Sequence, residues 1–91
     1  MASSVAASLA AARREADSRP DDADAQARVA DIDLAMGRIE ASFDRLLDTV
    51  KRTSGDERDK ARKHLLSLFE IFPPRDPRVS KARTALSSLL F

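Results

Sequence analysis

Apolar residues recur along the chain at spacings of three and four, in five runs that turn-forming residues separate. This spacing places side chains on one face of an α-helix, so each run predicts an amphipathic helix. Proline occurs only at positions 20, 73, 74 and 77, where it separates the runs instead of interrupting them. The pattern predicts an all-α fold of about five helices: residues 3–18, from Asp21 or Asp22 to Gly37, 39–52, 54–72 and 76–91.

The second and third predicted helices form a hairpin. Each carries one apolar stripe, made of Ala25, Val29, Ile32 and Met36 in the second helix and of Ile39, Phe43, Leu46, Leu47 and Val50 in the third. Gly37 ends the second helix, as glycine commonly does at helix C-termini. The turn around it is so short that the two helices must lie antiparallel.

The last two predicted helices begin at recognisable capping residues. Ser54 followed by Glu57 has the spacing of a capping box, in which each side chain accepts a bond from the other's backbone N–H. Asp76 followed by Pro77 is a strong helix start, with Asp as the cap and Pro at the first helical position. The predicted buried faces are Ala61, Leu65, Leu68, Phe69 and Phe72 in the fourth helix and Val79, Ala82, Leu86, Leu89 and Leu90 in the fifth.

Composition limits the classes of protein that the chain can represent. Its 91 residues allow one domain with one modest core. The absence of cysteine excludes disulfides and thiol chemistry from this chain and is compatible with a reducing cytosol. No apolar run reaches the roughly 18–20 residues of a membrane span, and the alanine-rich start lacks the basic leader of a signal peptide.

Charge is distributed unevenly along the chain. Residues 1–50 carry six Arg against ten Asp or Glu, a net −4, whereas residues 51–91 carry ten Lys or Arg against five Asp or Glu, a net +5. The simpler interpretation is two solvated helix surfaces that attract each other, and the alternative is a basic partner-binding face. Nucleic-acid binding gains little support, because no aromatic residue is interleaved with the cations to stack on bases.

No arrangement of residues predicts an enzyme, and none predicts a bound metal or cofactor. His64 is the only histidine, and no nucleophile or orienting carboxylate stands at helical spacing from it, so we expect it at the surface. Asp24 and Asp31 share one face of the second predicted helix, because they are seven residues apart. That acidic strip is either a solvated face or one wall of a groove for a basic peptide.

The segment 30–43, with the sequence ADIDLAMGRIEASF, resembles a tetratricopeptide repeat. A small residue, Ala30, stands at the packing position of the first helix, Gly37 lies between the helices, and small Ser42 takes the close-contact position of the second. Asp33 departs from the motif, because it stands where the repeat usually has a large aromatic residue. The resemblance implies a tetratricopeptide-like array of antiparallel helix hairpins that binds other proteins.

The second half of the chain resembles a more particular family, the bacterial thioredoxin-like proteins with a C-terminal tetratricopeptide domain, called chaperedoxins. The segments that carry the resemblance are 62–69 (RKHLLSLF), 76–79 (DPRV), 81–83 (KAR) and the ending 89–91 (LLF). It covers residues 20–91 as the helical domain proper, whereas residues 1–19 match only as a lead-in helix. No Cys-x-x-Cys motif is present, so we expect no redox activity, whether the chain is an excised domain or a stand-alone relative.

This second resemblance implies a function and a site. Members of the family hold unfolding client proteins in the cytosol and pass them to the chaperonin, on which the C-terminal helix docks. Carried over to this sequence, the candidate docking residues are Arg83, Leu86, Leu90 and Phe91. The implied partners are a chaperonin, unfolded clients and a thioredoxin domain in a full-length chain.

Two other functions stay open at this point. The apolar chain end could instead join two copies of the chain into a homodimer. A nucleic-acid-binding helical domain is the weaker alternative, because the chain as a whole is not strongly basic.

Overall fold

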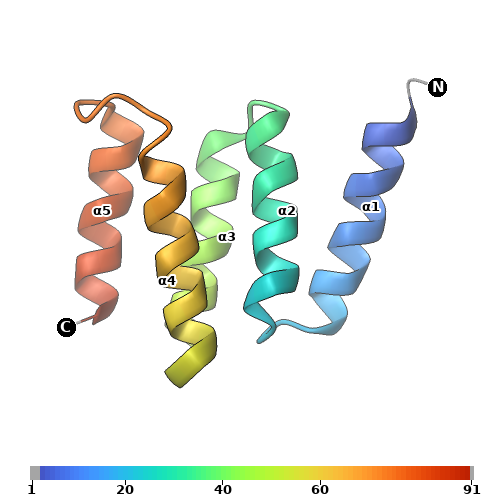
Figure 1. Cartoon of the computed structure of the whole chain (residues 1–91), viewed down its shortest axis with the longest axis horizontal. Coiled ribbons are helices and arrows are strands. Elements are labelled where there is room, and N and C mark those ends of the chain that lie inside the picture. Colours follow the sequence, from blue (N-terminus) through green and yellow to red (C-terminus); the bar gives the residue numbers. More distant parts are fainter. Residues whose placement is uncertain (1–2, 91) are drawn as a thin grey trace.

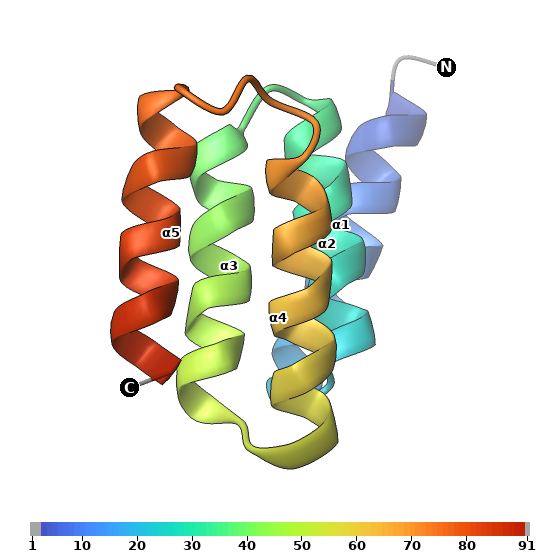
Figure 2. The ribbon, with the colours of Figure 1, turned by 60° about the vertical axis from the view of Figure 1, so that its left-hand side comes forward.

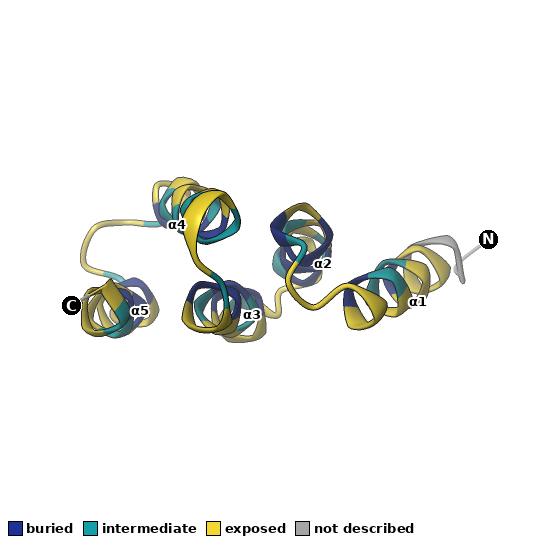
Figure 3. Ribbon diagram, turned by 90° about the horizontal axis from the view of Figure 1, so that it is seen from below, coloured by how far each residue is buried: buried dark blue, intermediate teal, exposed yellow. Residues whose placement is uncertain are grey.

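The computed structural model describes residues 3–90 and folds them into five helices. The helices are α1 (Ser3–Ser18), α2 (Ala23–Ala35), α3 (Ile39–Arg52), α4 (Gly55–Phe69) and α5 (Pro77–Leu90), as Figure 1 shows. They stand side by side in two layers, with α1, α3 and α5 in one layer and α2 and α4 in the other (Figure 3). This arrangement confirms the expected all-α array of antiparallel helix hairpins.

The turn between α2 and α3 has the geometry that the sequence predicts. Gly37 adopts a φ of +80°, a left-handed conformation that residues with a Cβ rarely adopt. Its N–H bonds to the carbonyl of Leu34 at 3.0 Å, and the N–H of Arg38 bonds to the carbonyl of Asp33 at 2.8 Å. These two bonds form a Schellman motif, which satisfies the last carbonyl groups of α2 and reverses the chain.

The helix caps are partly as predicted. Asp22 caps α2 by accepting a bond from the N–H of Ala25 at 3.1 Å, and Asp76 caps α5 by accepting one from the N–H of Arg78 at 2.9 Å. The predicted capping box of α4 is wrong, because the Ser54 side chain makes no cap bond. Its expected partner Glu57 instead accepts a 2.8 Å bond from the N–H of Ala23 and caps α2.

Most of the core lies between α2, α3, α4 and α5. Helix α3 lies at the centre of this core and packs against each of the other three helices (Figure 2). The ring of Phe43 meets those of Phe69 and Phe72 edge to face, at centroid distances of 5.1 and 5.8 Å. The buried residues of this cluster are Ala23, Ala30, Phe43, Leu46, Val50, Ala61, Leu65, Leu68, Phe69, Val79, Ala82 and Leu86.

A second, smaller cluster joins α1 to α2. Its buried members are Leu9, Ala16, Ala25 and Val29. The apolar stripe that predicted the buried face of α2 therefore marks only the face toward α1. The face toward α3 and α4 is lined by Leu34 and three alanines, and the alanines let the helices approach closely but carry little hydropathy signal.

Two predicted core positions are wrong, because Met36 in the second helix and Leu90 in the fifth are exposed. Met36 is 41% exposed, because α2 ends at Ala35 and the chain turns away from the core there. Phe72 packs against the core as predicted, but it lies beyond α4, which ends at Phe69, three residues earlier than predicted. The 70–76 segment that follows carries the chain across to the start of α5 (Figure 2).

Candidate protein-binding surfaces

The candidate docking residues of α5 lie in different surroundings. Leu86 is only 5% exposed and belongs to the core, whereas Leu90, one turn later, is 39% exposed. The Arg83 side chain lies on the exposed surface and spans to α4, where its guanidinium carbon is 5.0 Å from the centre of the Phe69 ring. Phe91 lies outside the described residues. Leu90 is thus the exposed candidate at the end of α5, Leu86 holds the helix in place, and Arg83 lies seven residues before Leu90 with its guanidinium toward α4.

The two acidic candidates of α2 lie along the seam between α2 and α4, and both are paired. Asp24 Oδ2 is 3.5 Å from Lys60 Nζ, and Asp31 Oδ1 is 2.7 Å from His64 Nε2. The carboxylate of Asp24, and after it that of Glu57, raises the pKa of Lys60. The expected acidic strip is therefore a mixed-charge seam, because α4 packs beside α2 and brings its cations with it.

A shallow groove of about 370 Å³ follows this seam. Small side chains of α2 form its floor and polar side chains of α4 its far wall. The lining residues are Ala23, Asp24, Ala27, Lys60, Lys63, His64 and Ser67. His64 is half-buried, and the carboxylate that orients it, Asp31, comes from α2, not from helical spacing within α4, where none was expected.

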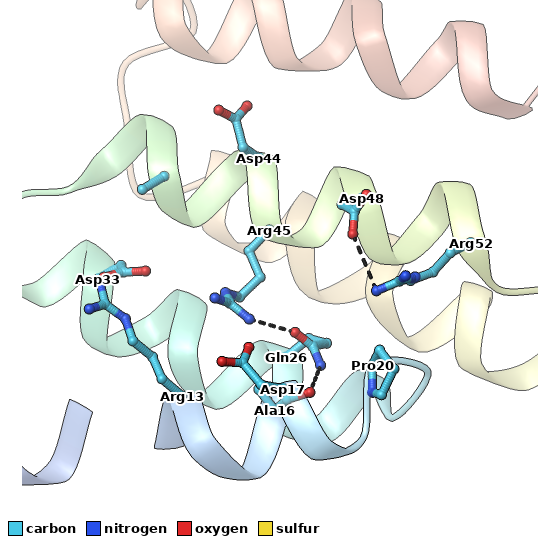
Figure 4. Close-up of a pocket in the computed structure, with 11 residues that line it drawn as sticks. Arg13, Ala16, Asp17, Pro20, Gln26, Asp33, Asp44, Arg45, Asp48 and Arg52 are labelled. Atoms are coloured by element: carbon cyan, nitrogen blue, oxygen red, sulfur yellow. Dashed lines mark hydrogen bonds and ion pairs between the residues drawn. The ribbon is translucent and has the colours of Figure 1, made fainter. Parts of the chain in front are cut away.

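A larger groove of about 650 Å³ lies between α1 and α3, with α2 as its floor (Figure 4). Two polar side chains of α2, Gln26 and Asp33, are almost fully buried there. The Gln26 amide nitrogen donates to the carbonyls of Ala16 at 2.9 Å and Arg19 at 3.1 Å, and its oxygen accepts from Arg45 at 2.8 Å. Gln26 thus ties α1, α2 and α3 together.

Asp33 is held by a single ion pair in this groove. Its Oδ1 is 3.3 Å from a guanidinium nitrogen of Arg13, which reaches over from α1 (Figure 4). A buried carboxylate is costly unless it is paired, so this contact helps to fix the position of α1. The departure from the tetratricopeptide motif at Asp33 is thereby explained: in place of aromatic packing, the position makes an ion pair to the preceding helix.

Sequence reasoning missed Gln26, Asp33 and their arginine partners as structural residues. One signal could have identified them: Gln26 and Asp33 alternate with Ala23 and Ala30 at spacings of three, four and three. Small and polar residues in such a stripe mark a helix face that neighbouring helices cover closely. The apolar stripe on the neighbouring face of α2 has the stronger hydropathy pattern, so the buried face was predicted from that stripe alone.

The described residues contain no group of three or more His, Cys, Asp or Glu side chains placed to hold a metal ion. Among the described residues, no helix combines the length and the apolar character needed to cross a membrane.

Comparison with known proteins matches residues 2–91 to a family model described as tetratricopeptide repeat. The similar curated proteins include uncharacterized proteins of Mycobacterium tuberculosis and Mycobacterium bovis. Each is 43% identical over 76 residues, which is 84% of this chain and 25% of the relative. The chain thus spans about a quarter of the length of these relatives. No solved structure matches the chain significantly.

Proposed function

The chain belongs to the tetratricopeptide repeat family, and we propose that it is the protein-interaction domain of a thioredoxin-like co-chaperone that acts in the cytosol. Tetratricopeptide domains generally bind other proteins. In this proposal the domain docks on a chaperonin through the end of α5, while the complete protein holds or delivers unfolding clients. Residues 20–91 would be the interaction domain and residues 1–19 its lead-in helix.

The main support for the proposal is that the apolar side chains of α5 pass from buried to exposed toward the end of the helix. Val79, Ala82 and Leu86 anchor the helix in the core, yet Leu90 is left 39% exposed at its end. An apolar side chain presented on a rigid helix loses little conformational freedom on binding, which favours affinity. The guanidinium of Arg83, seven residues earlier on the same helix, supplies charge that would speed the encounter with an acidic partner.

The α2–α4 seam is the second surface in this proposal. Asp24 and Asp31 would exchange their present partners, Lys60 and His64, for basic side chains of a bound client. Both pairs are at the surface, where ion pairs contribute little to stability. A partner could therefore replace them at small cost.

The pairing of the cations also supports protein over nucleic acid as the partner. Lys60, Arg62 and Lys63 of α4 lie within 4 Å of carboxylates, and Arg58 donates to the carbonyl of Val50. Cations so engaged are less available to phosphates, whose neutralisation supplies most non-specific affinity for nucleic acid.

The test is direct binding of the purified chain to a purified bacterial chaperonin. A double variant, Leu90→Gln with Phe91→Gln, should weaken binding by about tenfold or more, since buried apolar anchors dominate such interfaces. Ile71→Gln is the matched control, because Ile71 is an exposed apolar residue away from the end of α5. Circular dichroism should show the same helicity for all three proteins.

The possible results separate the candidate functions. Binding by the wild type and by Ile71→Gln, with loss in the double variant, supports docking through the end of α5. No binding by the wild type contradicts the chaperonin proposal. If the wild type also sediments as a dimer that the double variant does not form, the end of α5 is a homo-oligomerisation surface instead.

A further inference from the structure

A groove on the outer face of the array, between α3 and α5, has no role in the docking proposed above. It encloses about 330 Å³, and its floor is apolar, made of Phe43 and Leu47 from α3 and Ala82 and Ala85 from α5. No residue of α4 lines it, because α4 packs on the opposite side of this layer (Figure 3). The small side chains of α5 leave the floor open between the two helices.

The two walls of this groove carry opposite charge. Glu40 and Asp44 form the α3 wall, and Arg78 and Lys81 form the α5 wall. Among the described residues, Glu40, Asp44 and Lys81 make no ion pair within 4 Å, whereas Arg78 is held by Asp76. The groove therefore presents two unpaired carboxylates along one edge and an unpaired ammonium along the other.

Asp44 has no stabilising role within the fold that would account for it. Glu40 and Asp48 lie four residues before and after it on α3, and like charges at that spacing repel. Glu40 is in the first turn of α3, where the helix dipole favours an acid, and Asp48 is 3.6 Å from Arg52. Asp44 is exposed and has neither compensation, so a cationic side chain of a partner would relieve the repulsion along this edge.

The architecture indicates what kind of partner fits. The axes of α3 and α5 run alongside each other in the same direction (Figure 2), and from the inner side α4 lies against α3 and beside α5. A helix laid along the outer groove would meet the same pair of helices from the other side. Helix-in-groove binding uses an apolar stripe whose residues recur at spacings of three and four.

We propose that the outer α3–α5 groove binds an amphipathic helix of another protein. The apolar stripe of that helix lies mainly on Leu47 and Ala85, the half-buried residues of the floor, above the buried Phe43 and Ala82. A basic flank faces Glu40 and Asp44, and an acidic flank faces Lys81 and Arg78. This second interface is separate from the end of α5 and does not rest on the chaperonin proposal.

Three synthetic helical peptides of about fourteen residues, roughly four turns, test the proposal on the complete chain. They share one leucine stripe and differ only in their flanks, which are mixed, both basic or both acidic. Fluorescence anisotropy should rank the mixed peptide first, by about tenfold over the other two, because each of those places like charges along one wall. Equal affinities for the three peptides, or no binding, would overturn the proposal.

Charge reversal of one wall gives the decisive result. The double variant Glu40→Lys with Asp44→Lys makes both walls basic, so it should prefer the doubly acidic peptide. Asp56→Lys with Glu70→Lys is the control, since it changes the net charge equally, through exposed acids at the two ends of α4. The control should keep the wild-type ranking, and a ranking that changes equally in both variants would contradict a role for the groove.

A blocking variant distinguishes this occupant from a second copy of the chain. Ala85→Lys places a long side chain on the groove floor and should abolish binding of the mixed peptide, with helicity unchanged. Retained binding by Ala85→Lys would overturn the proposal. A wild-type dimer that this variant dissociates would also overturn it, because the groove would then belong to a second copy.

Discussion

The two outermost helices, α1 and α5, are attached to the array by different kinds of interaction. α5 places Val79, Ala82 and Leu86 in the main core, in one cluster with Phe43 and Phe69. The smaller apolar cluster of α1 is accompanied by polar contacts from Gln26, from Arg13 to Asp33 and from Arg28 to Glu15. Helices at corresponding ends of a regular array therefore need not be equally stable.

This difference has a physical consequence. Apolar burial in a shared core couples α5 to the unfolding of the whole domain. The contacts of α1 involve exposed side chains and a polar groove, which favour local opening with a lower free energy than global unfolding. We expect α1 to open while α2 to α5 stay folded.

The largest effect should come from truncating an apolar side chain of α5. Leu86→Ala removes a buried side chain and should lower the free energy of unfolding by about 2–5 kcal/mol, a large part of the stability of so small a domain. Urea unfolding followed by circular dichroism measures this change. The control Ile71→Ala, at a position 63% exposed, should stay within about 0.5 kcal/mol of the wild type.

A substitution that weakens the attachment of α1 should have a smaller effect on stability, and the effect should be local. Gln26→Ala removes the side-chain donor that the carbonyls of Ala16 and Arg19 share and leaves Arg45 without its acceptor, although both carbonyls keep a backbone donor. We expect a loss of about 1–3 kcal/mol, the usual range when buried polar partners lose their bond. Amide hydrogen exchange should show faster exchange in α1 and unchanged protection in α3; equal loss in both helices would contradict separate opening.

A third test concerns the start of α2, which α1 and α4 approach from opposite sides. Glu57→Ala removes the carboxylate that caps Ala23 and should cost about 0.5–2 kcal/mol. Ser54→Ala, at the other position of the predicted capping box, should cost much less because Ser54 makes no cap bond. If thermal unfolding shows that Ser54→Ala lowers stability more than Glu57→Ala does, Ser54 caps α4 after all, as the predicted capping box required.

Features that depend on neighbouring residues were predictable from the sequence. Gly37, Asp22 and Asp76 act within one or two turns of the chain, so their residue types alone indicate a left-handed turn and two helix caps. The number and order of the helices followed from such local signals.

Features that join distant residues were not predictable in this way. The bond from Ala23 to Glu57 spans 34 positions, and the pair of His64 with Asp31 spans 33. A periodic pattern shows which face of a helix is buried but not which helix covers it. The candidate site was limited by the same fact, because only the packing of α4 against α2 shows that Asp24 and Asp31 are paired.

The smallest effect should be the pH dependence of the α5 cap. Bonds from the side chain of Arg78, and next from its backbone N–H, lower the pKa of Asp76 from 3.8 to about 2. A carboxyl whose pKa is lower in the folded state stabilises the fold when ionised, so its contribution is present above about pH 4 and is lost as the pH falls toward about 2. The difference in unfolding free energy between the wild type and Asp76→Ala should therefore shrink across that window.

Arg78→Ala removes the main cause of the lowered pKa. In this variant the pKa of Asp76, followed by NMR, should move back toward its ordinary value. A difference that stays constant down to about pH 2 would show that Asp76 caps α5 without its charge, and its lowered pKa would then contribute nothing to stability.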